Sequence, residues 1–187
     1  VDEFNKFIAT VENIDHKETY DTLFLTGLRI GELCALRWCD LDLEHKKLSV
    51  RGSFSTASRK VTSPKTKTSI RTIDLPNRLV EELKQRYERK KKLDGFNDNY
   101  YVFGDIAITW PGTFRYRFNN DLKNADVKRI TIHGFRHSHA SYLLSNPMIS
   151  ESLVAERLGH SVDMLRSTYA HIYEKRRTAL VEYIEKL

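Results

Sequence analysis

Apolar residues recur every three to four positions through most of the chain, which is the spacing of amphipathic helices. The pattern predicts helices over residues 1–14, 18–25, 29–36, 76–92, 113–123, 133–145, 150–158, 162–169 and 175–187. Asn146-Pro147 separates two of these helices, and Gly159 is placed to cap the helix before it. The chain is therefore expected to be mainly helical.

Between residues 47 and 75 the apolar positions alternate instead, as they do in strands that bury one face. Residues 47–53, 59–62 and 69–75 favour strands, and the polar connections between them predict a small three-stranded antiparallel sheet. The segment Pro64 to Thr68 is a predicted turn, so its lysines should project from a hairpin. The expected fold class is α+β, mainly helical, in one domain of 187 residues.

The composition, with 40% apolar and 30% charged residues, is that of an ordinary globular protein. No apolar run approaches the roughly 18 residues that a membrane span needs, and the N-terminus shows no signal-peptide pattern. Cys34 and Cys39 have neither a CxxC spacing nor a histidine-rich neighbourhood. They are expected to be buried, reduced thiols of a cytosolic protein, without a metal or redox role.

The net charge of +6 is unevenly distributed along the chain. Residues 1–25 carry six acids against two lysines, whereas residues 51–71 carry six basic residues and no acid. Residues 84–92 add six basic side chains opposed only by Glu88. Such asymmetry suggests a surface that faces a polyanion, although for residues 84–92 alone a solvated face is the favoured interpretation.

Arg29 lies in the motif TGLRIGEL, where a glycine break meets the start of a helix. An arginine at that place can present its planar guanidinium to a phosphate, and a plain surface arginine is the simpler alternative. Glu32 is three residues further on the same helix face and is expected to orient Arg29.

In the motif HGFRHSH, the i,i+3 spacing places His133 and Arg136 on one side of a helix near its N-terminus, where anions bind well. His137 and His139 invite a metal interpretation. Without an HExxH pattern or a nearby thiol, however, a zinc hydrolase fits poorly. A lysine on the predicted hairpin can reach a leaving oxygen in a groove, or it can simply contact a DNA backbone.

His160 follows a predicted helix end in ERLGHS, and Tyr169 lies nine residues beyond it in STYAH. A histidine at a helix end usually interacts with the helix dipole, and a lone tyrosine usually packs in a core. The order Arg, Lys, His-x-x-Arg, Gly-His and Tyr is more informative than any one of these residues.

In this order, the motifs TGLRIGEL, PKTKTSIRTIDLP, HGFRHSHASYLL, ERLGHS and STYAH resemble those of the tyrosine recombinase, or phage integrase, family. The resemblance runs from about residue 3 to beyond Tyr169. It implies the DNA breaking–rejoining fold and the catalytic residues Arg29, Lys65, His133, Arg136, His160 and the nucleophile Tyr169, with Glu32 in support. Lys67 remains the alternative to Lys65, and the candidate DNA contacts are Arg59, Lys60, Lys67 and Arg71.

The resemblance implies a site-specific recombinase that integrates and excises a mobile element through a 3′-phosphotyrosyl intermediate, without metal, ATP or another cofactor. The implied partners are double-stranded DNA, further copies of the chain, and accessory DNA-bending proteins. The copies would form a homotetramer on the DNA, and the protein without DNA can be a monomer. The family's N-terminal core-binding domain is not in the chain, so the chain is expected to be a catalytic fragment. The apolar face of the last helix should pack either on its own core, the default, or on a neighbouring protomer, as the family suggests. A catalytically silent DNA-binding module and a type IB topoisomerase are the rival functions.

Overall fold

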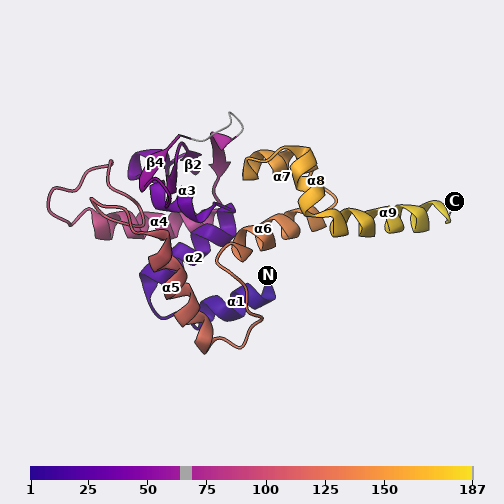
Figure 1. Cartoon of the computed structure of the whole chain (residues 1–187), viewed down its shortest axis with the longest axis horizontal. Helices are drawn as coiled ribbons and strands as arrows, with labels where there is room; N and C mark the ends of the chain where they lie inside the picture. Colours follow the sequence, from indigo (N-terminus) through magenta and orange to yellow (C-terminus); the bar gives the residue numbers. More distant parts are fainter. Residues whose placement is uncertain (64–68, 187) are drawn as a thin grey trace.

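The computed structural model describes residues 1–63 and 69–186, and most of this length is helical, as the apolar periodicity predicts (Figure 1). The helices are α1 (Asp2–Ala9), α2 (Ile14–Thr26), α3 (Ile30–Ala35), α4 (Asn77–Lys90), α5 (Pro111–Asp121), α6 (Gly134–Ser145), α7 (Glu151–Leu158), α8 (Val162–Thr168) and α9 (Ala170–Ile184). Single turns of 3-10 helix lie at Trp38–Asp40 and Leu122–Asn124.

Capping residues set the helix boundaries that bear on the site. The first helix was predicted to reach residue 14, but it ends at Ala9, where the hydroxyl of the C-cap residue Thr10 donates to the carbonyl of Phe7 at 2.8 Å. A separate helix, α2, starts at Ile14, because the Asn13 side chain accepts a hydrogen bond from His16 N at 3.1 Å. Gly27 ends α2 with φ 69°, and Gly159 ends α7 with φ 64°, which confirms the predicted cap.

The strands of the described residues form two antiparallel sheets. Strands β1 (Leu41–Asp42), β2 (Lys47–Val50) and β5 (Arg71–Asp74) pair in the order β1-β2-β5, whereas β3 (Ser53–Ser55) and β4 (Lys60–Thr62) form a separate hairpin. The prediction of one sheet from residues 47–53, 59–62 and 69–75 is therefore wrong in its membership. The third strand is β1, whose two residues are too few to show an alternation, and β4 pairs locally with β3 across the intervening turn. The predicted turn at residues 64–68 lies outside the described residues.

Two apolar clusters share helix α6. The larger cluster contains residues of helices α1, α2, α3, α4 and α5, residues of the three-stranded sheet, and Phe135 of α6. The smaller cluster joins the later turns of α6 to α7 and α8 and consists of Ala140, Leu144, Val154, Ala155, Leu158, Leu165 and Tyr169. Because α6 packs into both clusters, its remaining face has a fixed orientation toward α3 and the end of α7.

Ion pairs between α2 and α4 join acids of residues 1–25 to basic residues of the stretch 84–92. The buried Arg86 donates from Nη1 to Asp15 Oδ1 and Glu18 Oε2, both at 2.6 Å, and Arg89 also binds Glu18. Part of the basic stretch at residues 84–92 thus serves the fold. Cys34 is buried as predicted, whereas Cys39 is exposed, and both are free thiols.

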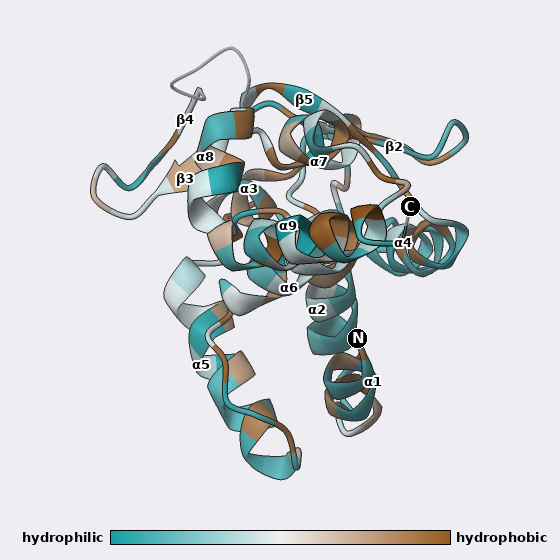
Figure 2. Ribbon diagram, turned by 90° about the vertical axis from the view of Figure 1, so that its right-hand side faces the viewer, coloured by the Kyte–Doolittle hydropathy of each residue, from teal (hydrophilic) through white to brown (hydrophobic). Residues whose placement is uncertain are grey.

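Helix α9 extends away from the rest of the chain, and the C-terminus lies far from the body (Figure 1). Apolar segments are visible on it in the view of Figure 2, and Leu180, Val181, Tyr183 and Ile184 are 55–69% exposed. The prediction that this helix packs on its own core is therefore wrong for its last turns. In the part of the chain that the structure describes, no helix combines the length and the apolar character needed to cross a membrane.

Candidate functional site

Arg29 lies at the start of α3, where the chain leaves the glycine turn that ends α2. Its Nη1 donates to Glu32 Oε1 at 2.9 Å, and its backbone N–H donates to Glu32 Oε2, also at 2.9 Å. The contact predicted from the i,i+3 spacing is present. About a third of the Arg29 side chain remains exposed (35%), so the guanidinium has donors left for a ligand.

Glu32 is buried and also holds Arg71 from β5. Arg71 donates to both carboxylate oxygens, from Nη1 to Oε1 at 3.1 Å and from Nη2 to Oε2 at 2.9 Å. Burial alone would raise the pKa of Glu32, but the hydrogen bonds and charges of Arg71 and Arg29 hold it below its usual range. Glu32 is therefore an anion shared by two arginines.

Arg71 has a different place from the one predicted for it. The sequence suggests a DNA contact, but the side chain is 3% exposed and its Nε donates to the carbonyl of Arg157 at 2.7 Å. Its remaining donors face Glu32 and the carbonyl of Ser69. Arg71 is thus an internal link between α3 and the end of α7, and it is not exposed for a DNA contact.

Arg136 projects from α6 toward the two glycine turns. Its Nη1 donates to the carbonyl of Gly27 at 2.6 Å, two residues before Arg29, and its Nη2 donates to the carbonyl of Leu158 at 2.5 Å. Burial, and then the positive charge of Arg29, lower its pKa to about 9, so it remains a cation at neutral pH. The two arginines of the predicted site therefore lie close enough to repel each other.

His160 stands against Arg136, with Nε2 at 2.8 Å from Arg136 Nη2. Burial and then the charges of Arg136, Arg29 and Arg71 lower its pKa to about 4, which makes it neutral at pH 7. Because a guanidinium can only donate, Nε2 accepts and the proton is on Nδ1. That Nδ1 is buried, and the described residues give it no partner.

Tyr169 lies at the junction of α8 and α9, 3% exposed in the smaller apolar cluster. Burial raises the pKa of its phenol. Its hydroxyl lies 3.1 Å from Nδ1 of His137, and the His137 ring is edge-on to that of His133, with centroids 4.9 Å apart. Burial, and then the neighbouring His137, Arg136 and Arg29, lower the pKa of His133.

The structure thus brings Arg29, Glu32, Arg136 and His160 into one connected cluster and places His133 and Tyr169 on either side of His137. Lys65 and Lys67 lie outside the described residues. Arg59 and Lys60 are exposed on the β3–β4 hairpin, where the Arg59 guanidinium lies 5.8 Å from the centre of the Trp110 ring.

The sequence did not single out His137 or Arg157 for the parts that they play. His137 has the i,i+4 spacing to His133 that signals a shared helix face, whereas the sequence analysis pairs His137 with His139, as candidate metal ligands. Arg157 donates to the carbonyls of Leu25 and Asp74 and to Nε2 of His139, whose pKa burial lowers to about 3. His139 is therefore a neutral core histidine.

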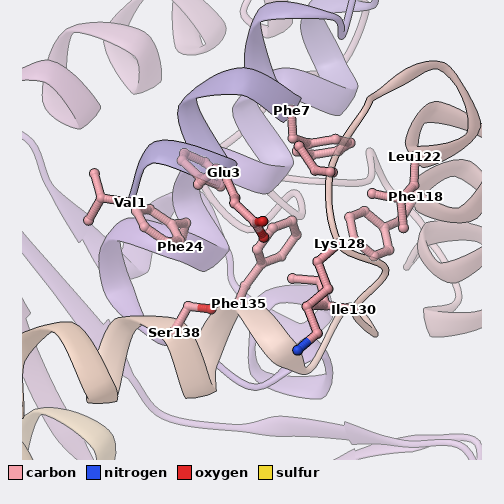
Figure 3. A pocket seen from close by; sticks show the side chains of 12 residues that line it. Val1, Glu3, Phe7, Phe24, Phe118, Leu122, Lys128, Ile130, Phe135 and Ser138 are labelled. Atoms are coloured by element: carbon pink, nitrogen blue, oxygen red, sulfur yellow. The ribbon is translucent and has the colours of Figure 1, made fainter.

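The described residues contain no group of three or more His, Cys, Asp or Glu side chains that could hold a metal ion. A pocket of about 170 Å³ lies on the other side of α6, against α1 and α5 (Figure 3). Phe135 and Ser138 point into it, on the helix face opposite to His133 and Arg136. This apolar pocket is separate from the cationic cluster and is not the candidate site.

The family model described as the phage integrase family matches residues 1–176. The ICEBs1 integrase of Bacillus subtilis (strain 168) is 31% identical over 199 residues, which covers 100% of this chain and 53% of that protein. The integrase of Staphylococcus phage L54a is 32% identical over 176 residues, which covers 87% of this chain and 49% of that protein. The chain spans about half the length of these curated relatives.

Solved structures share the fold. The crystal structure of XerA recombinase superposes with a TM-score of 0.72 at 24% identity, covering 94% of this chain and 63% of that one. The Tn1549 transposon integrase in complex with transposon right end DNA gives a TM-score of 0.70 at 22% identity, covering 96% and 63%. The predicted fold, that of tyrosine recombinase catalytic domains, is confirmed. By its sequence and its fold, this chain belongs to the phage integrase family of tyrosine recombinases.

Proposed function

We propose that this chain is the catalytic domain of a site-specific DNA recombinase that integrates and excises a mobile element. Tyr169 would be the nucleophile that cuts a DNA strand and holds it as a 3′-phosphotyrosyl intermediate. The observation that carries the proposal is the convergence of Arg29 and Arg136 beside the neutral His160. Two guanidiniums that repel each other form a place for an anion, and the phosphate of a DNA backbone is such an anion.

The reaction needs no external energy source, because the covalent phosphotyrosine bond retains the energy of the phosphodiester bond that is cut. As the Tyr169 oxygen attacks, negative charge grows on the non-bridging oxygens of the phosphate. Arg29 keeps exposed donors for these oxygens, and Arg136 places its guanidinium beside the same turn. After a rotation of its ring, His160 would donate from Nδ1 to one of them.

Two protons have to move during cleavage. Lys65, or Lys67 in its place, would protonate the 5′ oxygen as it leaves. The phenol proton passes to a base on α6, for which the family motif gives His133. Exchange of strands follows when the free 5′ hydroxyl of a partner duplex attacks the phosphotyrosine in the reverse of the first step.

Double-stranded DNA is the proposed partner, since the Tn1549 transposon integrase was solved in complex with transposon right end DNA and XerH recombinase was solved bound to its difH substrate. Arg59 and Lys60 on the exposed β3–β4 hairpin would contact its phosphates, with Lys67 as a further candidate. A homotetramer would assemble on the DNA, with α9 docking on a neighbouring protomer, and accessory DNA-bending proteins would support the complex.

A nicked suicide duplex carrying the ends of the mobile element tests the proposal. The chain should form a covalent protein–DNA adduct on a denaturing gel. Tyr169→Phe should bind the duplex and form none, because only the nucleophilic oxygen is lost. Tyr142→Phe, which removes the hydroxyl of a tyrosine that is 61% exposed on α6, is the matched control and should behave as wild type.

The rival functions predict other results. Retardation of the duplex without any adduct would indicate a DNA-binding module that does not cut. Relaxation of a supercoiled plasmid that lacks the element's ends would indicate a type IB topoisomerase. An adduct that persists in Tyr169→Phe would refute the assignment of the nucleophile.

A further inference from the structure

The hydroxyl of Tyr169 has a hydrogen-bond partner outside the His-x-x-Arg pair. Its oxygen lies 3.1 Å from Nδ1 of His137, and the two ring centroids are 5.8 Å apart. The phenol is buried, with 3% of the residue exposed, whereas His137 is exposed on the surface of α6. An imidazole therefore stands between the nucleophilic oxygen and solvent.

The position of His137 on the helix relates it to the phosphate site. At 3.6 residues per turn, His133 lies roughly 60° around α6 from Arg136 and roughly 40° from His137 on the other side. The rings of His133 and His137 meet edge to face, at 4.9 Å and 87°. One helix face thus runs from the guanidinium of the phosphate site, through one imidazole, to the imidazole that touches the phenol.

Electrostatics separate the two histidines. Among residues 1–63 and 69–186, the titratable groups in contact with His137 are Tyr169, from the α8–α9 junction, and His133, at the start of its own helix. Burial and the charges of His137, Arg136 and Arg29 lower the pKa of His133, which disfavours a proton there. The cations beside His133 therefore make it the poorer acceptor of the phenol proton, whereas His137 contacts the phenol directly at 3.1 Å.

We propose that His137 is a catalytic residue, the base that takes the proton of Tyr169 during strand cleavage, with His133 positioning its ring. As the Tyr169 oxygen bonds to phosphorus, its O–H bond breaks and the proton moves to Nδ1 of His137. The bond from phosphorus to the 5′ oxygen breaks, and the leaving oxygen takes a proton from the lysine assigned to that step. In religation the tyrosine leaves and His137 returns the proton.

This assignment rests on the proposed function and changes one part of it: the role of base moves from His133, which the family motif gives, to His137. The assay is formation of the covalent adduct on the suicide duplex under single-turnover conditions, measured from about pH 5 to pH 8, the range over which an imidazole changes charge. The wild-type rate should fall on the acidic side, where a protonated imidazole cannot accept the phenol proton. In His137→Gln the rate should drop by about 10²–10³-fold and lose this acidic limb, because an amide cannot take up the proton. Free imidazole should raise the rate of His137→Ala.

Two variants serve as comparisons. His171→Gln changes an exposed histidine two residues after Tyr169 and should keep both the rate and the acidic limb. His133→Gln should lower the rate but keep the limb. Circular dichroism should show that each variant is folded, and the rescue of His137→Ala by imidazole is a result that misfolding would not give.

The proposal is overturned if His137→Gln keeps the wild-type rate and acidic limb, or if His133→Gln alone loses the limb. If His137→Gln has no measurable activity, the imidazole experiment decides: rescue of His137→Ala supports the proposal, and no rescue overturns it. A wild-type chain that forms no adduct at any pH would overturn the proposed function, and the role of His137 with it.

Discussion

Replacing Arg71 with methionine removes an interaction that holds two parts of the site together, and its cost can be worked out from the contacts. Methionine fills a similar volume but cannot bond to either carboxylate oxygen of Glu32 or to the carbonyl of Arg157. Glu32 would keep Arg29 as a partner and remain buried. The change therefore leaves a buried carboxylate only partly compensated.

Breaking a buried ion pair by removing one partner costs about 3–5 kcal/mol, and the bonds that remain to Arg29 place this case near the lower end, about 3 kcal/mol. For a domain of this length, a loss of that size lowers the melting temperature by about 6–12 °C. Adding Glu32→Gln removes the stranded charge, so the double variant should be more stable than Arg71→Met alone.

The pH dependence gives a second measure of the same interaction. The pKa of Glu32 is lowered in the folded protein, so its contribution to stability is present above its unfolded pKa of about 4.5 and is lost as the pH falls through the folded value. Without Arg71, burial dominates and raises that pKa, so the sign reverses and protonation favours the folded variant. The stability difference between wild type and Arg71→Met should therefore be largest near neutral pH and shrink in acid.

Urea unfolding followed by circular dichroism, at neutral pH and at about pH 4, measures both effects. Arg166→Met is the matched control, because Arg166 forms a solvent-screened pair with Glu151 and its loss should cost much less stability than the loss of Arg71. The reasoning is refuted if Arg71→Met costs no more than this control. It is also refuted if the cost does not change with pH and Glu32→Gln brings no relief.

Other expectations follow from the same contacts. Arg29→Lys should reduce adduct formation by at least about 10²-fold in a folded protein, because an ammonium cannot hold two phosphate oxygens at once; near-wild-type rates would contradict this role. Arg59→Ala should weaken binding to DNA of any sequence and lower the slope of log affinity against log salt by about 1; an unchanged slope in gel shifts would remove the hairpin contact. Leu180→Ser with Ile184→Ser should leave the melting temperature unchanged but reduce the mass of protein–DNA assemblies in light scattering; equal masses would show that α9 does not join protomers.

The sequence predicts those contacts that depend only on spacing along one element. Arg29 contacts Glu32 because residues three apart share a helix face. Gly159 caps α7 because glycine adopts the left-handed backbone conformation of the cap without strain. The motif order likewise predicts that Arg136 and His160 belong together, and the structure places them in contact. These features need no knowledge of the packing of the rest of the chain.

The sequence does not predict which backbone carbonyls a side chain will bind. Arg136 binds the carbonyls of Gly27 and Leu158, and Arg71 binds that of Arg157, and every residue offers a carbonyl of the same kind. The basic residues near Arg71 in the sequence suggest that it contacts DNA. In β5, however, alternate residues face inward, and Arg71 shares the buried face with Ile73.

The division of the apolar residues into two clusters bears on how Tyr169, the proposed nucleophile, would reach a phosphate. Tyr169 belongs to the smaller cluster, whereas Arg29 is fixed to the larger one through α3. What joins the two clusters is α6, together with hydrogen bonds from Arg71, Arg136 and Arg157 to backbone carbonyls on both sides. A shift of α8 and α9 that breaks the 3.1 Å contact between Tyr169 and His137 would leave the larger cluster and its arginines intact. One hydrogen bond thus holds the Tyr169 hydroxyl, whereas Arg136 is held by two backbone carbonyls, and this difference suits the proposed role of Tyr169 as a nucleophile that moves to the phosphate.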